Sequence, residues 1–151
     1  MLQKIDFSKT GTIIEIGAGS GVFTKKLLKK MRPDSKLIVL ETNGLFCNNL
    51  KKITDPRLTV YNDSALNLKN YSVQNSIDYI ISGIPLANIT NQDKENILSS
   101  SFNSLSSGGL FVQFQYSKES EKKLKEIFDE VTVGFTPLNI PPAFVFYCLK
   151  K

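Results

Sequence analysis

Three glycines at alternate positions, Gly17, Gly19 and Gly21, are the residues whose spacing most directly predicts chemistry. They follow the predicted strand Thr12–Ile16, in which Ile13, Ile14 and Ile16 are β-branched and apolar, as is typical of a buried parallel strand. A segment with helical spacing begins after them, at Val22. Glycine permits positive φ and a close approach of the backbone to a ligand, and free N–H groups at a helix start bind polar or anionic groups. The pattern therefore predicts a small-molecule site at a strand–turn–helix junction.

The spacing of the glycines indicates which small molecule. Dinucleotide-binding folds use G-x-G-x-x-G, but Val22 stands where the third glycine would be, which disfavours an NAD-dependent enzyme. The chain has G-x-G-x-G instead, and Glu15 precedes the first glycine by two positions. This pattern resembles motif I of the class I S-adenosylmethionine-dependent methyltransferases. The resemblance implies S-adenosyl-L-methionine as cofactor, held by Glu15, Gly17, Ala18, Gly19 and Gly21.

Two carboxylates follow the next two predicted strands. Glu41 ends the predicted strand Lys36–Glu41, and Asp63 closely follows the predicted strand Leu58–Tyr61. Because ligands of open α/β sheets bind at the carboxyl ends of the strands, we expect both side chains beside the glycine turn. A carboxylate at Glu41 can accept both ribose hydroxyls of an adenosyl group, and one at Asp63 can accept from its adenine amino group. A helix cap or a solvated turn is the alternative for each. Neighbouring polar residues complete the expected cofactor site, namely Thr42, Ser64 and Ser82.

The methyl acceptor should lie at the end of the fourth predicted strand, Ile77–Ile81. Adenine N6-methyltransferases, including the rRNA-dimethylating branch, carry Asn or Asp there and an aromatic residue three positions later. These side chains hold the target amine and stack on the flipped base. Gly83 and Leu86 occupy those two positions in this chain. Nucleic acid is therefore the less favoured partner.

The stretch Ser82–Leu86 instead resembles the Ser-Gly-Leu-Pro-Leu segment of the bacterial phospholipid N-methyltransferases, which are related to the rRNA dimethylases. The similarity extends from about Thr12 to Tyr147, and its other matching segments are Gly21–Thr24, Glu41–Asn43, Phe46-Cys47, Gly108–Tyr116 and Asn139–Ala143. It implies N-methylation of phosphatidylethanolamine at the cytoplasmic face of the membrane. It also implies contact of the acceptor with Phe23, Gly83, Ile84, Pro85 and Leu86.

Aromatic rings can stabilise the methylated, cationic amine by roughly 0.5–2 kcal/mol. Candidates are Phe23, Tyr116, Phe144 and Tyr147, with core packing as the alternative role. We expect Tyr116 and Tyr147 to be the catalytic residues, since a phenolate is one group that can take the proton of the acceptor ammonium.

Two alternative functions remain open at the level of the sequence. One is an rRNA or other nucleic-acid adenine N6-methyltransferase, which the basic charge favours. The other is a non-catalytic S-adenosylmethionine-binding module. Phospholipid N-methyltransferases usually carry a helical segment before the first strand, whereas about eleven residues precede Thr12 here.

The composition excludes several classes of chemistry. The chain of 151 residues contains no histidine, which rules out a His-based triad and argues against a metal site. Cys47 and Cys148 are far apart in sequence, and we expect buried, reduced thiols. Neither a membrane-spanning apolar run nor a secretory signal is present, so a cytoplasmic location is expected.

The net charge of +5 comes with clustered lysines. One interpretation is solvated helix faces, and the other is attraction to an anionic membrane surface, to which the protein would bind peripherally, or to nucleic acid. The clusters are Lys25, Lys26, Lys29, Lys30 and Arg32, then Lys118, Lys122, Lys123 and Lys125, and finally Lys150-Lys151.

Alternating strand and helix patterns must position these residues, and they predict one α/β domain over residues 1–151. The expected sheet is Rossmann-like, with helices on both faces. The methyltransferase resemblance implies seven strands, mostly parallel, with the last antiparallel. The remaining predicted strands are Leu110–Phe114, Glu130–Phe135 and Ala143–Leu149. The predicted helices are Val22–Met31, Gly44–Ile53, Asn91–Leu105 with Asn91 as N-cap, and Lys118–Phe128.

Overall fold

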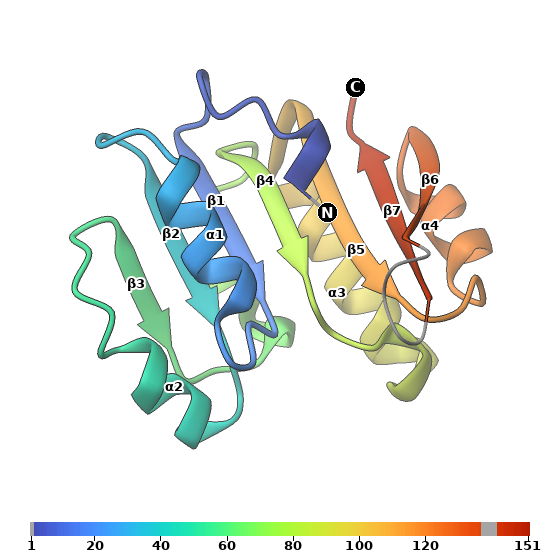
Figure 1. Ribbon diagram of the computed structural model, residues 1–151. Coiled ribbons are helices and arrows are strands. Elements are labelled where there is room, and N and C mark those ends of the chain that lie inside the picture. The colour runs from blue at the N-terminus through green and yellow to red at the C-terminus, as the bar shows by residue number, and fades with distance from the viewer. Residues whose placement is uncertain (1, 137–141) are drawn as a thin grey trace.

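The computed structural model describes residues 2–136 and 142–151, and within these residues seven strands form a single sheet in the order β3-β2-β1-β4-β5-β7-β6 (Figure 1). β7 runs antiparallel to both of its neighbours, and the other pairs are parallel. The predicted fold class is therefore confirmed. The strands are β1 (Thr12–Ile16), β2 (Lys36–Leu40), β3 (Leu58–Tyr61), β4 (Ile77–Ser82), β5 (Leu105–Gln115), β6 (Glu130–Thr136) and β7 (Ala143–Leu149).

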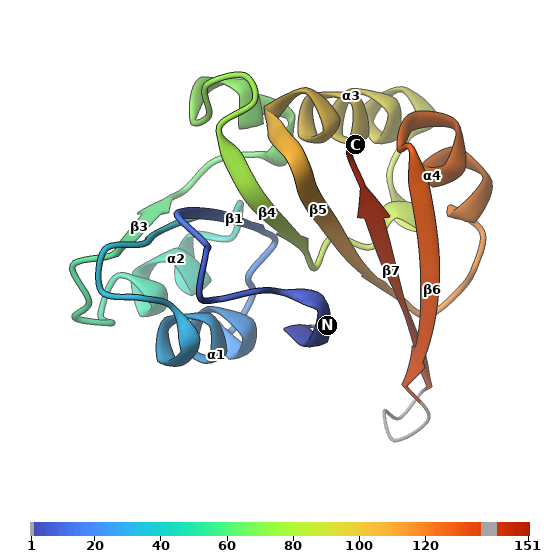
Figure 2. The same cartoon turned by 90° about the horizontal axis from the view of Figure 1, so that it is seen from above.

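The helices cover both faces of the sheet. Figure 2 shows α1 (Val22–Lys30) and α2 (Gly44–Leu50) on one side, and α3 (Asn91–Ser104) and α4 (Glu121–Ile127) on the other. The connection from β3 to β4 contains a 3-10 helix, Ala65–Asn70, and a second one, Leu86–Asn88, follows β4.

Two apolar clusters fill the spaces between the sheet and these layers. The apolar stripe of α1 contributes Leu27 and Leu28 to one cluster, and that of α3 contributes Ile97 and Leu98 to the other. The central strands are apolar on both faces because both faces are covered, as a parallel sheet requires. Both cysteines are buried and unpaired, as predicted.

The chain order creates a natural ligand site between β1 and β4. From β1 the chain progresses outward through β2 and β3, whereas β4 and β5 extend the sheet in the opposite direction. The register pairs Ile16 with both Leu40 and Ser82, so the carboxyl ends of β1, β2 and β4 lie level with one another. Ligands of open α/β sheets bind at such a switch point.

Arg57, in the turn before β3, fixes the far end of α1. Its guanidinium donates to the carbonyls of Leu28 and Met31, both at 2.7 Å, and therefore satisfies carbonyls that the helix end leaves free. Asp55 orients the guanidinium through a 2.6 Å ion pair, and this hydrogen bonding lowers the pKa of Asp55 to about 2. The carboxyl end of the helix that follows the glycine turn is therefore held in place.

Several predicted boundaries are wrong. α2 ends at Leu50 and not at Ile53. The N-cap of α3 is Thr90, whose hydroxyl accepts from the Asp93 N–H at 3.0 Å, and not Asn91. α4 begins at Glu121 instead of Lys118. β5 begins at Leu105, directly after α3, whereas the predicted strand begins at Leu110.

Candidate functional site

The three glycines of the turn, Gly17, Gly19 and Gly21, all have positive φ, but the space around each of them differs. A Cβ on Gly21 would lie 2.6 Å from Leu50, so this glycine allows α1 to pack on α2. A Cβ on Gly17 would lie 2.9 Å from the Ile84 side chain. At Gly19 a Cβ would meet nothing within 4 Å. Gly19 is therefore the position at which the turn faces open space.

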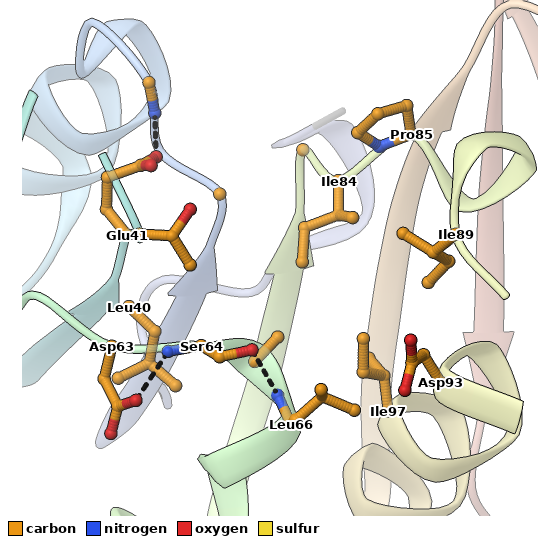
Figure 3. Close-up of a pocket in the computed structure, with 15 residues that line it drawn as sticks. Leu40, Glu41, Asp63, Ser64, Leu66, Ile84, Pro85, Ile89, Asp93 and Ile97 are labelled. Atoms are coloured by element: carbon orange, nitrogen blue, oxygen red, sulfur yellow. Dashed lines mark hydrogen bonds between the residues drawn. The ribbon is translucent and has the colours of Figure 1, made fainter.

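A cavity of about 370 Å³ opens beside this turn at the carboxyl ends of the strands. Figure 3 shows Glu41 and Asp63 on one side of it and Ile84, Pro85 and Ile89 on the other. The structure thus brings together most of the residues predicted from the strand ends. Those that line the cavity are Gly17, Gly19, Glu41, Thr42, Asp63, Ser64, Gly83, Ile84 and Pro85.

Glu41 connects the end of β2 to the glycine turn. Its carboxylate accepts from the N–H of Gly19 through one oxygen and from the N–H of Asn43 through the other, both at 2.8 Å. The side chain is 7% exposed, and each carboxylate oxygen keeps a lone pair for a further donor. Glu41 can therefore shape the turn and accept hydroxyl donors from a ligand at the same time.

Asp63 is held by three donors at the end of β3. Its carboxylate accepts from Tyr71 Oη at 2.5 Å, from Asn67 Nδ2 at 2.8 Å and from the Ser64 N–H at 2.7 Å. These hydrogen bonds, that of Tyr71 above all, lower the pKa of Asp63. The residue is thus a charged acceptor with a fixed orientation on the cavity wall.

Glu15 lies elsewhere than its predicted role requires. It is buried, does not line the cavity, and accepts a 2.6 Å hydrogen bond from Thr24 Oγ1 in α1. Desolvation raises the pKa of Glu15 to about 7. The side chain therefore supports the turn from beneath by tying β1 to α1.

We expect Glu15→Gln to make folding stability less dependent on pH. A buried carboxyl with a raised pKa costs stability as pH increases from its ordinary value, near 4.5, towards about 7. The variant should match the parent below pH 4.5 and exceed it by up to about 3 kcal/mol at pH 8. Urea denaturation at each pH measures the difference. Glu130→Gln, at an exposed residue, serves as control. If the free energies of unfolding of Glu15→Gln and the parent changed with pH in parallel, the prediction would be contradicted.

A second cavity, of about 410 Å³, adjoins the first because Gly83 and Pro85 line both. Tyr116 lies on its wall and is 60% exposed. The ring of Phe114, another wall residue, is 5.3 Å from that of Tyr116 and 6.5 Å from that of Phe23. The structure thus places Tyr116 next to Gly83 and Pro85. These two belong to the segment Gly83–Leu86, called the acceptor segment below because the methyl acceptor is expected there.

Besides Glu15, six predicted site residues line neither cavity, and two of them are Phe23, described above, and Tyr147, described below. Leu86 is fully buried in the cluster beneath α3, and Ser82 is also fully buried. Ala18 packs against the cluster beneath α1, and Gly21 serves helix packing. Leu86 therefore has no exposed surface that an acceptor could contact in this structure.

Tyr147 is the predicted residue that lies farthest from its expected place. Tyr147 pairs with Val112 of β5, which in turn pairs with Ile81 of β4, so it lies three strands away from β1, and its ring packs in the cluster beneath α1. It lines a different cavity with Tyr79, and Lys4 Nζ is 4.8 Å from its ring centroid. The structure does not bring Tyr147 to the glycine turn, and we do not retain it as a catalytic candidate.

The sequence did not point to the α3 side of the main cavity. Asp93 and Ile97 of α3 contribute to its wall, together with Ile89 in the segment before that helix. An acidic residue in the first turn of a helix was the signal available for Asp93, and it is equally typical of a simple cap. The motif Asn139–Ala143 lies mostly outside the described residues.

Residues 2–136 and 142–151 contain neither a metal-binding cluster nor a membrane-spanning helix. No group of three or more His, Cys, Asp or Glu side chains is arranged to hold a metal ion there. No helix in the same residues is long and apolar enough to cross a membrane.

The known proteins that this chain resembles in sequence are methyltransferases. The family model "Ribosomal RNA adenine dimethylase" matches residues 1–150. An ornithine lipid N-methyltransferase of Singulisphaera acidiphila is 27% identical over 153 residues, which is 97% of this chain and 80% of the relative.

Solved structures share the fold at lower identity. The CurJ carbon methyltransferase superimposes with a TM-score of 0.74 at 17% identity, over 99% of this chain and 51% of that one. A S-adenosylmethionine-dependent methyltransferase from Aquifex aeolicus gives 0.69 at 15% identity, over 91% and 81%. This chain therefore spans about half the length of the first structure and most of the second.

Proposed function

The chain belongs to the ribosomal RNA adenine dimethylase family and is a class I S-adenosylmethionine-dependent N-methyltransferase, and we propose that its methyl acceptor is the amine of a phosphatidylethanolamine-type lipid headgroup. One observation carries the proposal. A Cβ on Gly83 would lie 2.5 Å from the carbonyl oxygen of Gly17, so this backbone leaves no room for a side chain at position 83.

The residues of the main cavity fit S-adenosyl-L-methionine. A volume of about 370 Å³ lies within the range of small-molecule sites, and Gly19 leaves the side of the turn open. We assign the backbone of Gly17 and Gly19 to the methionine part, Glu41 to the ribose hydroxyls and Asp63 to the adenine. Thr42 and Ser64 complete the wall. When bound, the cofactor supplies a methyl group activated by its sulfonium.

The acceptor segment favours a small amine over a nucleobase. Adenine methyltransferases need a polar side chain at position 83 and a ring at position 86 to hold and stack a base. Here Gly83 has no space for the first, and Leu86 is 0% exposed in the core. Ile84 and Pro85, which remain at the cavity, have apolar side chains. The relative from Singulisphaera acidiphila, named for a lipid substrate, supports the same choice.

An amine that enters through the second cavity would meet Gly83 and Pro85 before the cofactor cavity. The chain's contribution to the reaction is then alignment, because an unprotonated amine needs only to be held in line with the methyl carbon, at roughly 3–3.5 Å. Tyr116, on the same wall, can stabilise the methylated cation through its ring by roughly 0.5–2 kcal/mol.

Transfer of a labelled methyl group tests this proposal. Purified protein is incubated with labelled S-adenosyl-L-methionine and one of three acceptors: phosphatidylethanolamine vesicles, ornithine lipid vesicles or unmodified ribosomal RNA. Label in phosphatidylethanolamine supports the proposal. Label in ornithine lipid alone moves the substrate to the class of the curated relative. Label in RNA alone refutes the lipid assignment and supports the adenine methyltransferase alternative, which the family name favours.

We further propose that an anionic membrane surface is the partner that presents this lipid. Lys25, Lys26, Lys29 and Lys30 are exposed on α1, and none forms an ion pair with a residue that the structure describes. On α4, by contrast, Lys123 and Lys125 are paired with glutamates. α1, the helix that also carries Phe23, therefore presents four lysines without a carboxylate partner among the described residues, whereas only Lys122 is in that state on α4.

Lys26→Gln/Lys30→Gln should weaken binding to vesicles that contain phosphatidylglycerol. Each lysine near such a surface contributes about 1 kcal/mol, so two should cost about 2 kcal/mol, or roughly 30-fold in the partition coefficient. Sedimentation with vesicles measures the coefficient. Lys122→Gln/Lys125→Gln is the matched control on α4. Equal losses in both variants would mean that net charge, and not the α1 surface, determines binding.

A further inference from the structure

Gln113 is a polar side chain in an otherwise apolar part of the sheet. It lies on β5, level with Ser82 of β4 on one side and Phe146 of β7 on the other, and is 0% exposed. Burial of an amide is unfavourable unless its hydrogen bonds are made. The contacts of this side chain therefore indicate what it does.

Its amide nitrogen holds the acceptor segment. Gln113 Nε2 donates to the carbonyl of Ile84 at 2.8 Å and to the carbonyl of Phe114 at 2.8 Å. Both amide hydrogens are thus used, and the orientation of the amide is determined, because a flipped group would turn its oxygen towards two carbonyl oxygens. One bond is to its own strand, and the other crosses to the segment after β4.

The oxygen of the same amide is not used. Gln113 Oε1 and Ser82 Oγ are both buried and have no hydrogen-bond partner among the described residues. A residue selected only to fill space would avoid an unsatisfied acceptor. The function of the Gln113 side chain therefore lies in its two N–H donors, and in particular in the one that bonds to the Ile84 carbonyl.

The segment that this bond holds lies between the two halves of the site. Gly83 donates to the carbonyl of Ile16 at 2.9 Å and packs directly on Gly17, while Ile84 lines the main cavity. A small movement of Ile84 would therefore alter the wall between cofactor and acceptor.

We propose that Gln113 is a positioning residue for methyl transfer, which fixes the Gly83–Leu86 segment through the Ile84 carbonyl so that the acceptor nitrogen is held in line. This inference rests on the proposed function, in which that segment faces the acceptor. Gln113 itself contacts neither substrate nor cofactor.

Gln113→Met, which keeps the length of the side chain and removes its donors, tests the proposal. We expect kcat for phosphatidylethanolamine vesicles to fall at least tenfold, while the Kd for S-adenosyl-L-methionine, measured by calorimetry, changes less than twofold. Amide hydrogen exchange in a peptide that covers residues 83–89 should accelerate in the protein saturated with S-adenosyl-L-homocysteine. A loss of cofactor affinity as large as the loss of kcat would overturn the proposal.

Ser106→Ala is the matched control. Ser106 is also on β5 and donates to a backbone carbonyl of β4, that of Ile77 at 3.1 Å, but it lies at the other end of β5 and lines neither cavity. If Gln113→Met and Ser106→Ala change kcat and exchange equally, the special role of Gln113 is refuted. If lipids accept no methyl group at all, the proposed function fails, and the exchange experiment still decides whether Gln113 holds the segment.

Gln113→Glu provides a second variant with a pH signature. A protonated carboxyl can donate to the Ile84 carbonyl, whereas the ionised form would repel it, and burial raises the pKa of a carboxyl. The activity of this variant relative to the parent should therefore rise at least threefold as pH is lowered from 9 to 6. A ratio that does not change with pH would count against the proposal.

Discussion

Glu41→Ala is expected to weaken binding of S-adenosyl-L-methionine by about 3 kcal/mol, or roughly 150-fold in Kd. The substitution removes the proposed charge-assisted bonds to the ribose hydroxyls. It also removes the acceptor for the N–H groups of Gly19 and Asn43, both bonded at 2.8 Å. The turn and the start of α2 would therefore lose the group that holds them in the binding geometry. Calorimetric titration measures the change.

Glu41→Gln separates the two contributions. The amide keeps one oxygen acceptor but cannot satisfy both N–H groups and loses the charge, so its Kd should fall between those of the parent and the alanine variant. Glu130→Ala, at an exposed residue of β6, should bind like the parent. An unchanged Kd in Glu41→Ala would remove Glu41 from the cofactor site.

The strands were the part of the fold that local pattern predicted best. β1, β3 and β7 begin and end where the sequence analysis placed them. Their residue types suit a buried or half-buried pleated surface, and this environment is encoded by consecutive residues. In such segments the local preference and the tertiary packing agree.

The start of β5 shows where local pattern fails. Ser106 and Gly109 suggest a turn by their own chemistry, but the preceding Leu105 is fully buried and pairs with Ile77 of β4. Ser106 Oγ also donates to the Ile77 carbonyl at 3.1 Å. Contacts with β4, almost thirty residues earlier in the chain, thus extend β5 into a segment whose own residues favour a turn. No window of neighbouring residues contains this information.

The site divides in the same way. Glu41 and Asp63 were predictable because each ends a parallel strand, and such strand ends meet at one edge. Tyr147 was misplaced because it was chosen for the chemistry of its phenol, whereas the sheet order puts β7 three strands from β1 and its ring packs beneath α1, beside Lys4. Asp93 and Gln113 were missed because neither belongs to a recognisable motif. Asp93 reaches the cavity, and Gln113 reaches Ile84, only through the folding of distant segments.

Gly83→Ala is expected to lower kcat/KM for the lipid acceptor at least about 100-fold, because a displacement of about 1 Å at a reacting centre can have that effect. The added Cβ would lie 2.5 Å from the Gly17 carbonyl oxygen, a backbone atom of the glycine turn. Either the acceptor segment or the glycine turn must therefore move. The same overpacking should lower the free energy of unfolding by about 1–3 kcal/mol. Steady-state kinetics and urea denaturation measure the two effects.

Gly44→Ala is the control, because it also replaces a glycine by alanine but does so where the added Cβ is not crowded. Gly44 is the first residue of α2, and a Cβ there would have Asn62 Oδ1 at 3.8 Å, an ordinary contact. This variant should therefore keep its activity and gain up to about 1 kcal/mol of stability from the better helix former. If Gly83→Ala also kept full activity, position 83 would tolerate a side chain. The close packing of Gly83 on Gly17 would then no longer argue against a nucleobase acceptor, and the choice of a lipid amine would rest on the curated relative alone.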